Sequence, residues 1–181
     1  IRSFETNDIW QILLIRSLFF IIALTIFLFI TYKKHTIKEI KKSGVQAIIA
    51  GLFLSLSFVA YVVAMSKTTV ANVVFIISTQ TIFLALFGFL FLKEKITFKG
   101  LIAITLAFLG MLVMVGDSIN QGTLFGNIVA FAIPINFTIL VMIIRKFPDL
   151  DMVPAIFYSG IFSGMYGLLL ANNLTFSSND I

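Results

Sequence analysis

The stretch 70-VANVVFIISTQTIFLALFGFLFL-92 indicates a membrane-spanning helix. It contains no charged side chain, and it exceeds the about 20 apolar residues that a helix needs to cross a bilayer. Polar residues occur at Asn72 near its start and in a row at its centre, from Ser78 to Thr81. The amide of Gln80 cannot satisfy all of its hydrogen bonds within its own helix. We therefore expect Gln80 to face other helices or water rather than lipid.

The composition of the whole chain agrees with a membrane environment. Of 181 residues, 60% are hydrophobic and 12% are charged, and the mean hydropathy is +1.09. Soluble domains have about 45–50% apolar and about 25% charged residues, so this chain has too little polar surface to cover a soluble fold. There is no cysteine, which excludes disulfides and thiolate metal sites.

Apolar runs of similar length recur along the chain and predict six membrane-spanning segments. They are solid rather than alternating, which favours helices over a β-barrel. The predicted fold class is all-α, a polytopic transmembrane helix bundle. The predicted spans are Ile9–Ile30, Val45–Met65, Val70–Leu92, Gly100–Val115, Leu124–Ile144 and Val153–Ala171.

The basic residues are concentrated in alternate loops. Loop 31–44 holds five lysines, loop 93–100 holds three, and loop 145–152 holds Arg145 and Lys146. Basic loops of membrane proteins face the cytoplasm. We therefore expect these three loops on the cytoplasmic side of the cell membrane, and both chain ends outside. The pI of 9.6 then reports topology, and a nucleic-acid surface is not expected.

Two segments resemble a known family. In 64-AMSKTTVANVVFIISTQTIFLALFGFLFLKEKITFKGLIAITLAFLGMLVMVG-116, a Thr–x–Ala turn at Thr69 precedes a long helix, a Leu–x–Glu–Lys end at 92–95 and a glycine-bearing helix. The segment 126-GNIVAFAIPINFTILVMIIRK-146 is similar to the first helix of a second repeat, and Arg16 matches a frequent arginine. The chain resembles the EamA-like family of the drug/metabolite transporter superfamily.

The resemblance implies ten helices in two five-helix repeats of opposite orientation. Residues 1–116 would then be the first repeat without its first helix, and residues 117–181 the start of the second repeat. One helix would precede residue 1 and three would follow residue 181. Members often carry a proline where this chain has Thr81, so the sequence leaves open whether the third span kinks.

Polar residues at mid-span depth are the candidates for a substrate cavity. Gln80 and Asn136 act either as interhelical packing groups or as cavity groups, and Arg16 either faces the bundle or extends to the outer headgroups. Asn136 follows Pro134, which removes a helical hydrogen bond and predicts a bend. The full candidate set is Arg16, Ser55, Gln80, Thr81, Asn136 and Ser159.

Two further features complete the pattern. Small residues at Ala103, Ala107 and Gly110, and at Gly160 and Gly164, predict close helix contacts. Glu94 lies among lysines after the third span, and it belongs either to a cytoplasmic interface cluster or to a gate. That cluster comprises Lys93, Glu94 and Lys95, with Lys99 nearby.

The residues carry no enzyme signature, no cofactor motif and no metal-ligand cluster. The expected function is a secondary transporter, an exporter of small organic metabolites such as amino acids that works by alternating access. The alternative is a non-transporting membrane scaffold or assembly partner. The expected partners are a small-molecule substrate and the lipid bilayer, and a homodimer stays open.

Overall fold

The computed structural model describes residues 9–120 and 123–171, and this part of the chain is helical throughout, without strands. Its elements are α1 Ile9–Tyr32, a 3-10 helix Lys33–His35, α2 Thr36–Lys42, α3 Gly44–Lys67, α4 Val70–Ser78, α5 Gln80–Leu92, α6 Phe98–Asn120, α7 Leu124–Lys146 and α8 Val153–Leu170. The predicted fold class, a helix bundle, is confirmed.

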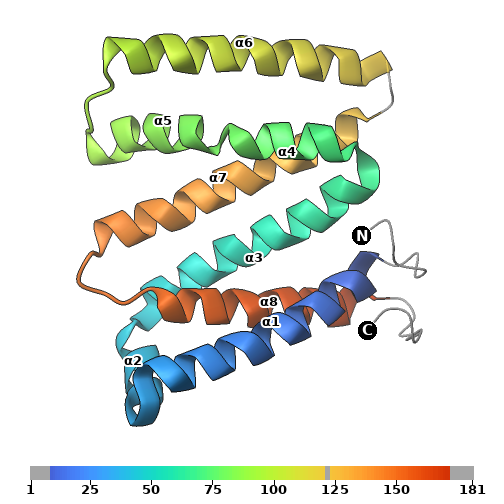
Figure 1. The fold of residues 1–181 in the computed structure, drawn as a ribbon. Helices are drawn as coiled ribbons and strands as arrows, with labels where there is room; N and C mark the ends of the chain where they lie inside the picture. Colours follow the sequence, from blue (N-terminus) through green and yellow to red (C-terminus); the bar gives the residue numbers. More distant parts are fainter. Residues whose placement is uncertain (1–8, 121–122, 172–181) are drawn as a thin grey trace.

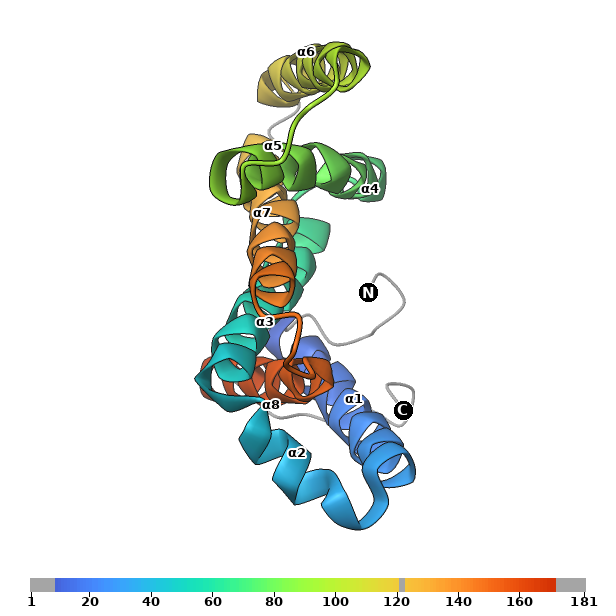
Figure 2. The ribbon, with the colours of Figure 1, turned by 90° about the vertical axis from the view of Figure 1, so that its left-hand side faces the viewer.

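The helices form a row rather than a closed ring. Helices α3 and α7 pack against each other at its centre, with α8 and then α1 on one side. On the other side, α4 and α5 lie against α7, and α6 stands at the edge with few close contacts (Figures 1 and 2). Neighbours in the row are therefore often distant in sequence, as α1 and α8 are.

Five elements are long and apolar enough to cross a membrane. They are Ile9–Tyr32, Gly44–Lys67, Val70–Leu92, Leu124–Lys146 and Val153–Leu170. The remaining predicted span is present as α6, whose residues Phe98–Gly110 form a shorter apolar segment. Large apolar side chains such as Phe19, Phe29 and Leu169 are exposed along these helices, as a lipid environment requires.

The three connections that contain most of the basic residues lie at the same end of the helices. The α1–α3 connection, the α5–α6 connection and the α7–α8 connection all lie on the left in Figure 1, and the α3–α4 turn lies on the right. We call the helix ends on the left of Figure 1 the basic end of the bundle, and the helix ends on the right the opposite end. The hydroxyl of Tyr32 donates a hydrogen bond to Asp151, which joins the end of α1 to the α7–α8 connection.

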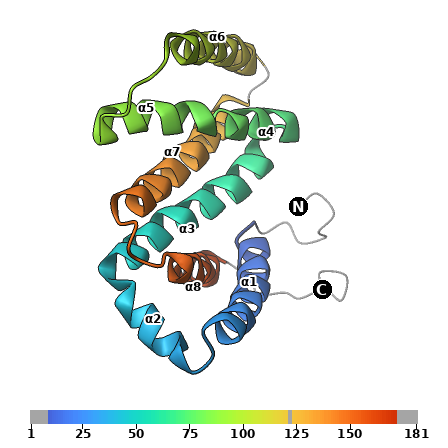
Figure 3. The same cartoon turned by 60° about the vertical axis from the view of Figure 1, so that its left-hand side comes forward.

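The predicted loop 31–44 contains helical structure. Helix α1 extends to Tyr32, and a 3-10 turn and α2 follow before α3 begins at Gly44 (Figure 3). The hydroxyl of Thr36 donates to the Lys33 carbonyl at 2.8 Å, which stabilises the turn. Lysine and glutamate are good helix formers, so a charged segment can still be helical.

Glycines bring the central helices into backbone contact. A Cβ on Gly51 of α3 would lie 2.7 Å from the Ala155 carbonyl of α8, and one on Gly167 of α8 would lie 2.8 Å from the Leu14 nitrogen of α1. The predicted contact at Gly160 and Gly164 is confirmed, because Ile21 and Ser17 of α1 pack there.

Candidate functional site

The helical segment of residues 70–92 is interrupted at Thr79. Thr79 lies between α4 and α5, with φ −74° and ψ −4°, and its N–H donates to the Ile76 carbonyl at 3.1 Å. The Ser78 hydroxyl donates to the Phe75 carbonyl at 2.6 Å, and the Thr79 hydroxyl donates to the Ile76 carbonyl at 2.6 Å. Such hydroxyl-to-carbonyl bonds compete with the helical ladder and bend helices. The span is therefore interrupted at its polar centre, where no proline is present.

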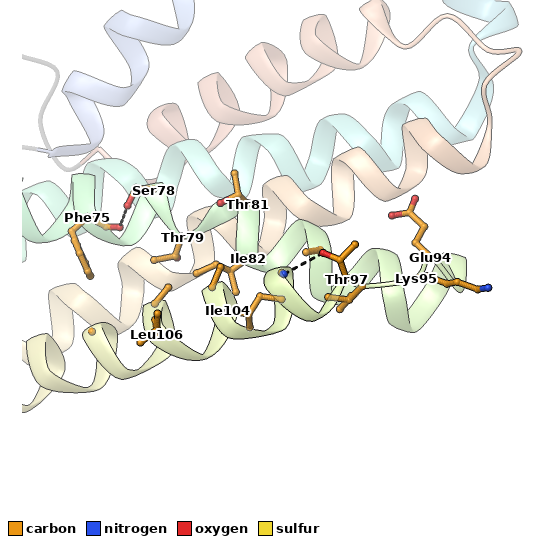
Figure 4. Close-up of a pocket in the computed structure, with 16 residues that line it drawn as sticks. Phe75, Ser78, Thr79, Thr81, Ile82, Glu94, Lys95, Thr97, Ile104 and Leu106 are labelled. Atoms are coloured by element: carbon orange, nitrogen blue, oxygen red, sulfur yellow. Dashed lines mark hydrogen bonds between the residues drawn. The ribbon is translucent and has the colours of Figure 1, made fainter.

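A groove of about 850 Å³ lies beside the break, between α4–α5 and α6. Figure 4 shows Phe75, Thr79 and Ile82 on one wall, with Ile104 and Leu106 of α6 facing them. Ser78 and Thr81 also line it, so hydroxyl groups are concentrated at mid-span. The full lining is Phe75, Ser78, Thr79, Thr81, Ile82, Ala85, Glu94, Lys95, Ile96, Thr97, Gly100, Ala103, Ile104, Leu106, Ala107 and Gly110.

An ion pair joins α7 to the α5–α6 connection at the basic end. Arg145 Nη1 donates to both carboxylate oxygens of Glu94, at 2.9 and 3.1 Å. The backbone places Glu94: Lys93 adopts a left-handed conformation with φ 55°, and the Glu94 N–H donates to the Gly88 carbonyl at 3.1 Å. The carboxylate also lies against Gly88, where a Cβ would be 2.5 Å from Glu94 Oε2.

This pairing adds a partner from α7 to the predicted cluster of Lys93, Glu94 and Lys95. The carboxylate binds Arg145, and Glu94 and Lys95 also line the basic end of the groove. Figure 4 shows Glu94 turned toward α7 and Lys95 pointing away from it. The carboxylate therefore links α7 to the α5–α6 connection, which the neighbouring lysines cannot do.

A buried polar cluster joins α7 to the α3–α4 turn at the opposite end. The Thr68 hydroxyl donates to Asn127 Oδ1 at 2.6 Å, and Asn72 Nδ2 lies 3.2 Å from both of their oxygens. Asn127 is fully buried, and Gly126 packs on the Lys67 carbonyl. Thr69 caps α4 by accepting from the Asn72 N–H at 3.2 Å, which gives the Thr–x–Ala turn a local role.

Of the six predicted cavity residues, Thr81 lines the groove described above. Thr81 is exposed, whereas its neighbour Gln80 is half-buried outside the lining. Asn136 is half-buried on α7, and α7 continues as one helix past Pro134 to Lys146.

The other predicted residues lie on the far side of the row. Ser55 and Ser159 are fully buried, and their hydroxyls donate to the Leu52 and Ile156 carbonyls of their own helices. Arg16 is exposed on α1, with its guanidinium carbon 4.7 Å from the centroid of the Phe58 ring.

Some groove residues were predicted for a different role, and others were missed. Ala103, Ala107 and Gly110 line the groove, where the sequence predicted close helix contacts, and the nearest atom to a Cβ on Gly110 would be 3.9 Å away. Thr79 and Thr97 were not among the candidates. The signal for Thr79 was its position in the polar run, but spacing alone does not reveal where a helix breaks.

The five apolar helices that are long enough to cross a membrane indicate a multi-pass membrane protein. A comparison with known protein families identifies its family. A model of the EamA-like transporter family matches residues 2–116, and the chain belongs to this family. Members of the family are membrane transporters rather than enzymes. No curated protein and no solved structure has a significant match to the chain.

Proposed function

We propose that the chain is part of a secondary transporter that exports small organic metabolites, such as amino acids, across the cytoplasmic membrane. The basic end faces the cytoplasm in this proposal, because basic segments are retained on that side. Residues 1–116 belong to the first repeat and residues 117–181 begin the second. Membership in a family of transporters supports the general class.

The interrupted span beside the groove is the observation that carries the proposal. Secondary transporters bind their substrates near the membrane midplane at discontinuous helices, where freed backbone and side-chain polar groups reach the cavity. The break at Thr79 lies about 14 Å along the span from Val70, close to the middle of a bilayer. Ser78, Thr79 and Thr81 line the groove at that depth.

The contacts of α7 suggest how access alternates. At the opposite end, α7 is held by the buried cluster around Asn127 and by the close backbone contact at Gly126. Toward the basic end, Leu140 of α7 belongs to a buried cluster with Ala47 of α3, and the exposed pair of Glu94 and Arg145 joins α7 to the α5–α6 connection. An exposed pair contributes about 0–1 kcal/mol and breaks easily, whereas a buried hydrogen-bonded cluster does not. We therefore assign the opposite end as the pivot and the ion pair as the cytoplasmic gate.

A counterflow screen of the full-length protein tests the function. The purified protein is reconstituted in proteoliposomes, which are loaded with one compound at a time from a panel of amino acids and amines. Uptake of the same compound in labelled form is then measured. At least one compound should exchange faster than in protein-free vesicles. A protein that folds and inserts but moves no member of the panel supports the scaffold alternative.

Two variants connect the flux to the groove. Thr81→Val removes a hydroxyl from a residue of the lining. Thr105→Val removes a hydroxyl from a residue of α6 that is outside the lining and donates to the Leu101 carbonyl. We expect Thr81→Val to lower the exchange rate and Thr105→Val to leave it near the wild-type rate. Equal rates in the two variants would contradict the assignment of the groove.

A further inference from the structure

Arg16 lies on α1 against two aromatic rings of α3. Its guanidinium carbon is 4.7 Å from the centroid of the Phe58 ring and 5.7 Å from that of Tyr61. Phe20, one turn further along α1, packs edge-on against Phe58 with centroids 5.7 Å apart. The cation therefore has a fixed aromatic support, and an arginine stacked on a ring keeps its edge N–H groups available for a ligand.

Arg16 lies two helical turns, about 10 Å, from the start of α1. Side chains of α1 lean toward its N-terminus, which is at the opposite end, so an arginine extending to the headgroups would lean that way. Instead, the guanidinium lies closer to Phe58 than to Tyr61. Phe58 is about 14 Å along α3 from Lys67, and Tyr61 is about 9 Å from it. The charge is thus held within a helix that is long and apolar enough to cross a membrane, where an ionised group is costly and usually functional.

No described carboxylate neutralises this charge. The acidic residues whose side chains the structure describes are Glu39, Glu94, Asp149 and Asp151, and they all lie in the segments at the basic end. Arg16 is exposed, so its free edge is open to an incoming group. A carboxylate is the planar partner that a guanidinium binds through two parallel hydrogen bonds.

We propose that Arg16, supported by Phe58 and Tyr61, binds the carboxylate of the transported substrate. The substrate class is then a small organic acid or amino acid whose apolar part packs on the aromatic rings. The inference rests on the proposed transport function and narrows it, because amines without a carboxylate would lack the ion pair. The site lies on the α1 side of the row, so in this proposal the transported substrate contacts Arg16 and the groove beside the broken helix at different points of its path.

Paired compounds test the proposal on the full-length protein. Leucine and phenylalanine are compared with isoamylamine and 2-phenylethylamine, which have the same apolar groups without the carboxylate. Counterflow in proteoliposomes measures transport, and thermal stabilisation in detergent measures binding. Because hydrogen bonds to charged groups are strong, we expect the acids to be preferred by about ten- to a hundredfold.

Variants at the site decide whether Arg16 produces this preference. Arg16→Gln should abolish the preference for acids, Arg16→Lys should retain part of it, and Lys67→Gln, a charge removal at the end of α3, should leave it unchanged. If Arg16→Gln does not fold, Tyr61→Phe replaces it. This variant keeps the ring, removes the hydroxyl donor and should weaken acid binding severalfold.

Three results would overturn the proposal. The first is wild-type protein that binds the amines as well as the acids, and the second is Arg16→Gln protein that keeps the preference. The third is an effect of Arg16→Gln seen in vesicles that contain phosphatidylglycerol and absent in phosphatidylcholine, because Arg16 would then bind the headgroup of an anionic lipid. If acids stabilise the protein in an Arg16-dependent way but nothing is transported, the transport function fails and the carboxylate site stands.

Discussion

The ion pair between Glu94 and Arg145 gives the sharpest prediction about the transport cycle. In the described conformation, the pair holds α7 to the α5–α6 connection at the basic end. Glu94→Gln and Arg145→Gln each remove one charge, so both should favour conformations in which this end is open. The side chains are 42% and 49% exposed, and pairs with such exposure contribute about 0.2–1 kcal/mol. The ratio of open to closed protein should therefore rise by at most about fivefold.

The separation of the two connections measures this ratio. Spin labels at Phe98→Cys and Asp149→Cys, both exposed positions, report the distance between the start of α6 and the α7–α8 connection. Double electron–electron resonance gives the populations of the short and long distances. Gly88→Ala is an independent perturbation, because its Cβ would lie 2.5 Å from Glu94 Oε2 and displace the carboxylate at little cost to the backbone.

Controls separate the pair from a general charge effect. Lys146→Gln removes a positive charge beside Arg145, and it should leave the distance populations unchanged. The exchanged pair, Glu94→Arg with Arg145→Glu, should restore most of the closed population. The gate assignment is refuted if Glu94→Gln, Arg145→Gln and Gly88→Ala all give the wild-type distribution.

Three further predictions concern packing and topology. Gly51→Ala should lower stability in detergent by about 1–3 kcal/mol, because its Cβ meets the α8 backbone. Gly110→Ala should be neutral, because the nearest atom to its Cβ would be 3.9 Å away. Equal melting temperatures of the two variants would contradict the packing described. Asn127→Ala should cost about 1–3 kcal/mol in the same assay by leaving buried partners unpaired, and an unchanged melting temperature would argue against the pivot. Lys38→Cys and Lys99→Cys should react with an impermeant maleimide only after cells are opened, and labelling of intact cells would reverse the proposed orientation.

The sequence was sufficient for the features that the bilayer itself imposes. An apolar run such as Leu124–Ile144 predicts a span directly, since backbone groups in lipid must be paired within the helix. The small residues Gly160 and Gly164 likewise predicted a close contact, which the structure assigns to α1. Alternation of the basic loops also predicted that they share one end of the bundle.

Features that depend on distant partners could not be predicted in the same way. Glu94 is surrounded by lysines in sequence, yet the row of helices brings Arg145 of α7 to it. The buried bond between Thr68 and Asn127 likewise joins two turns that are far apart in the chain. The break at Thr79 depends on a competition between hydroxyl and backbone hydrogen bonds, which residue identity alone does not decide.

Water access to Thr81 tests whether the interrupted span lines a water-filled substrate groove. A single cysteine is placed in the full-length protein either at Thr81, which lines the groove, or at Leu90, an exposed apolar position on the same helix outside the lining. We expect an impermeant thiol reagent to modify Thr81→Cys, a transported substrate to slow that reaction, and Leu90→Cys to stay unmodified in the lipid. The account is contradicted if Thr81→Cys reacts no faster than Leu90→Cys, or if the transported compound leaves its rate unchanged.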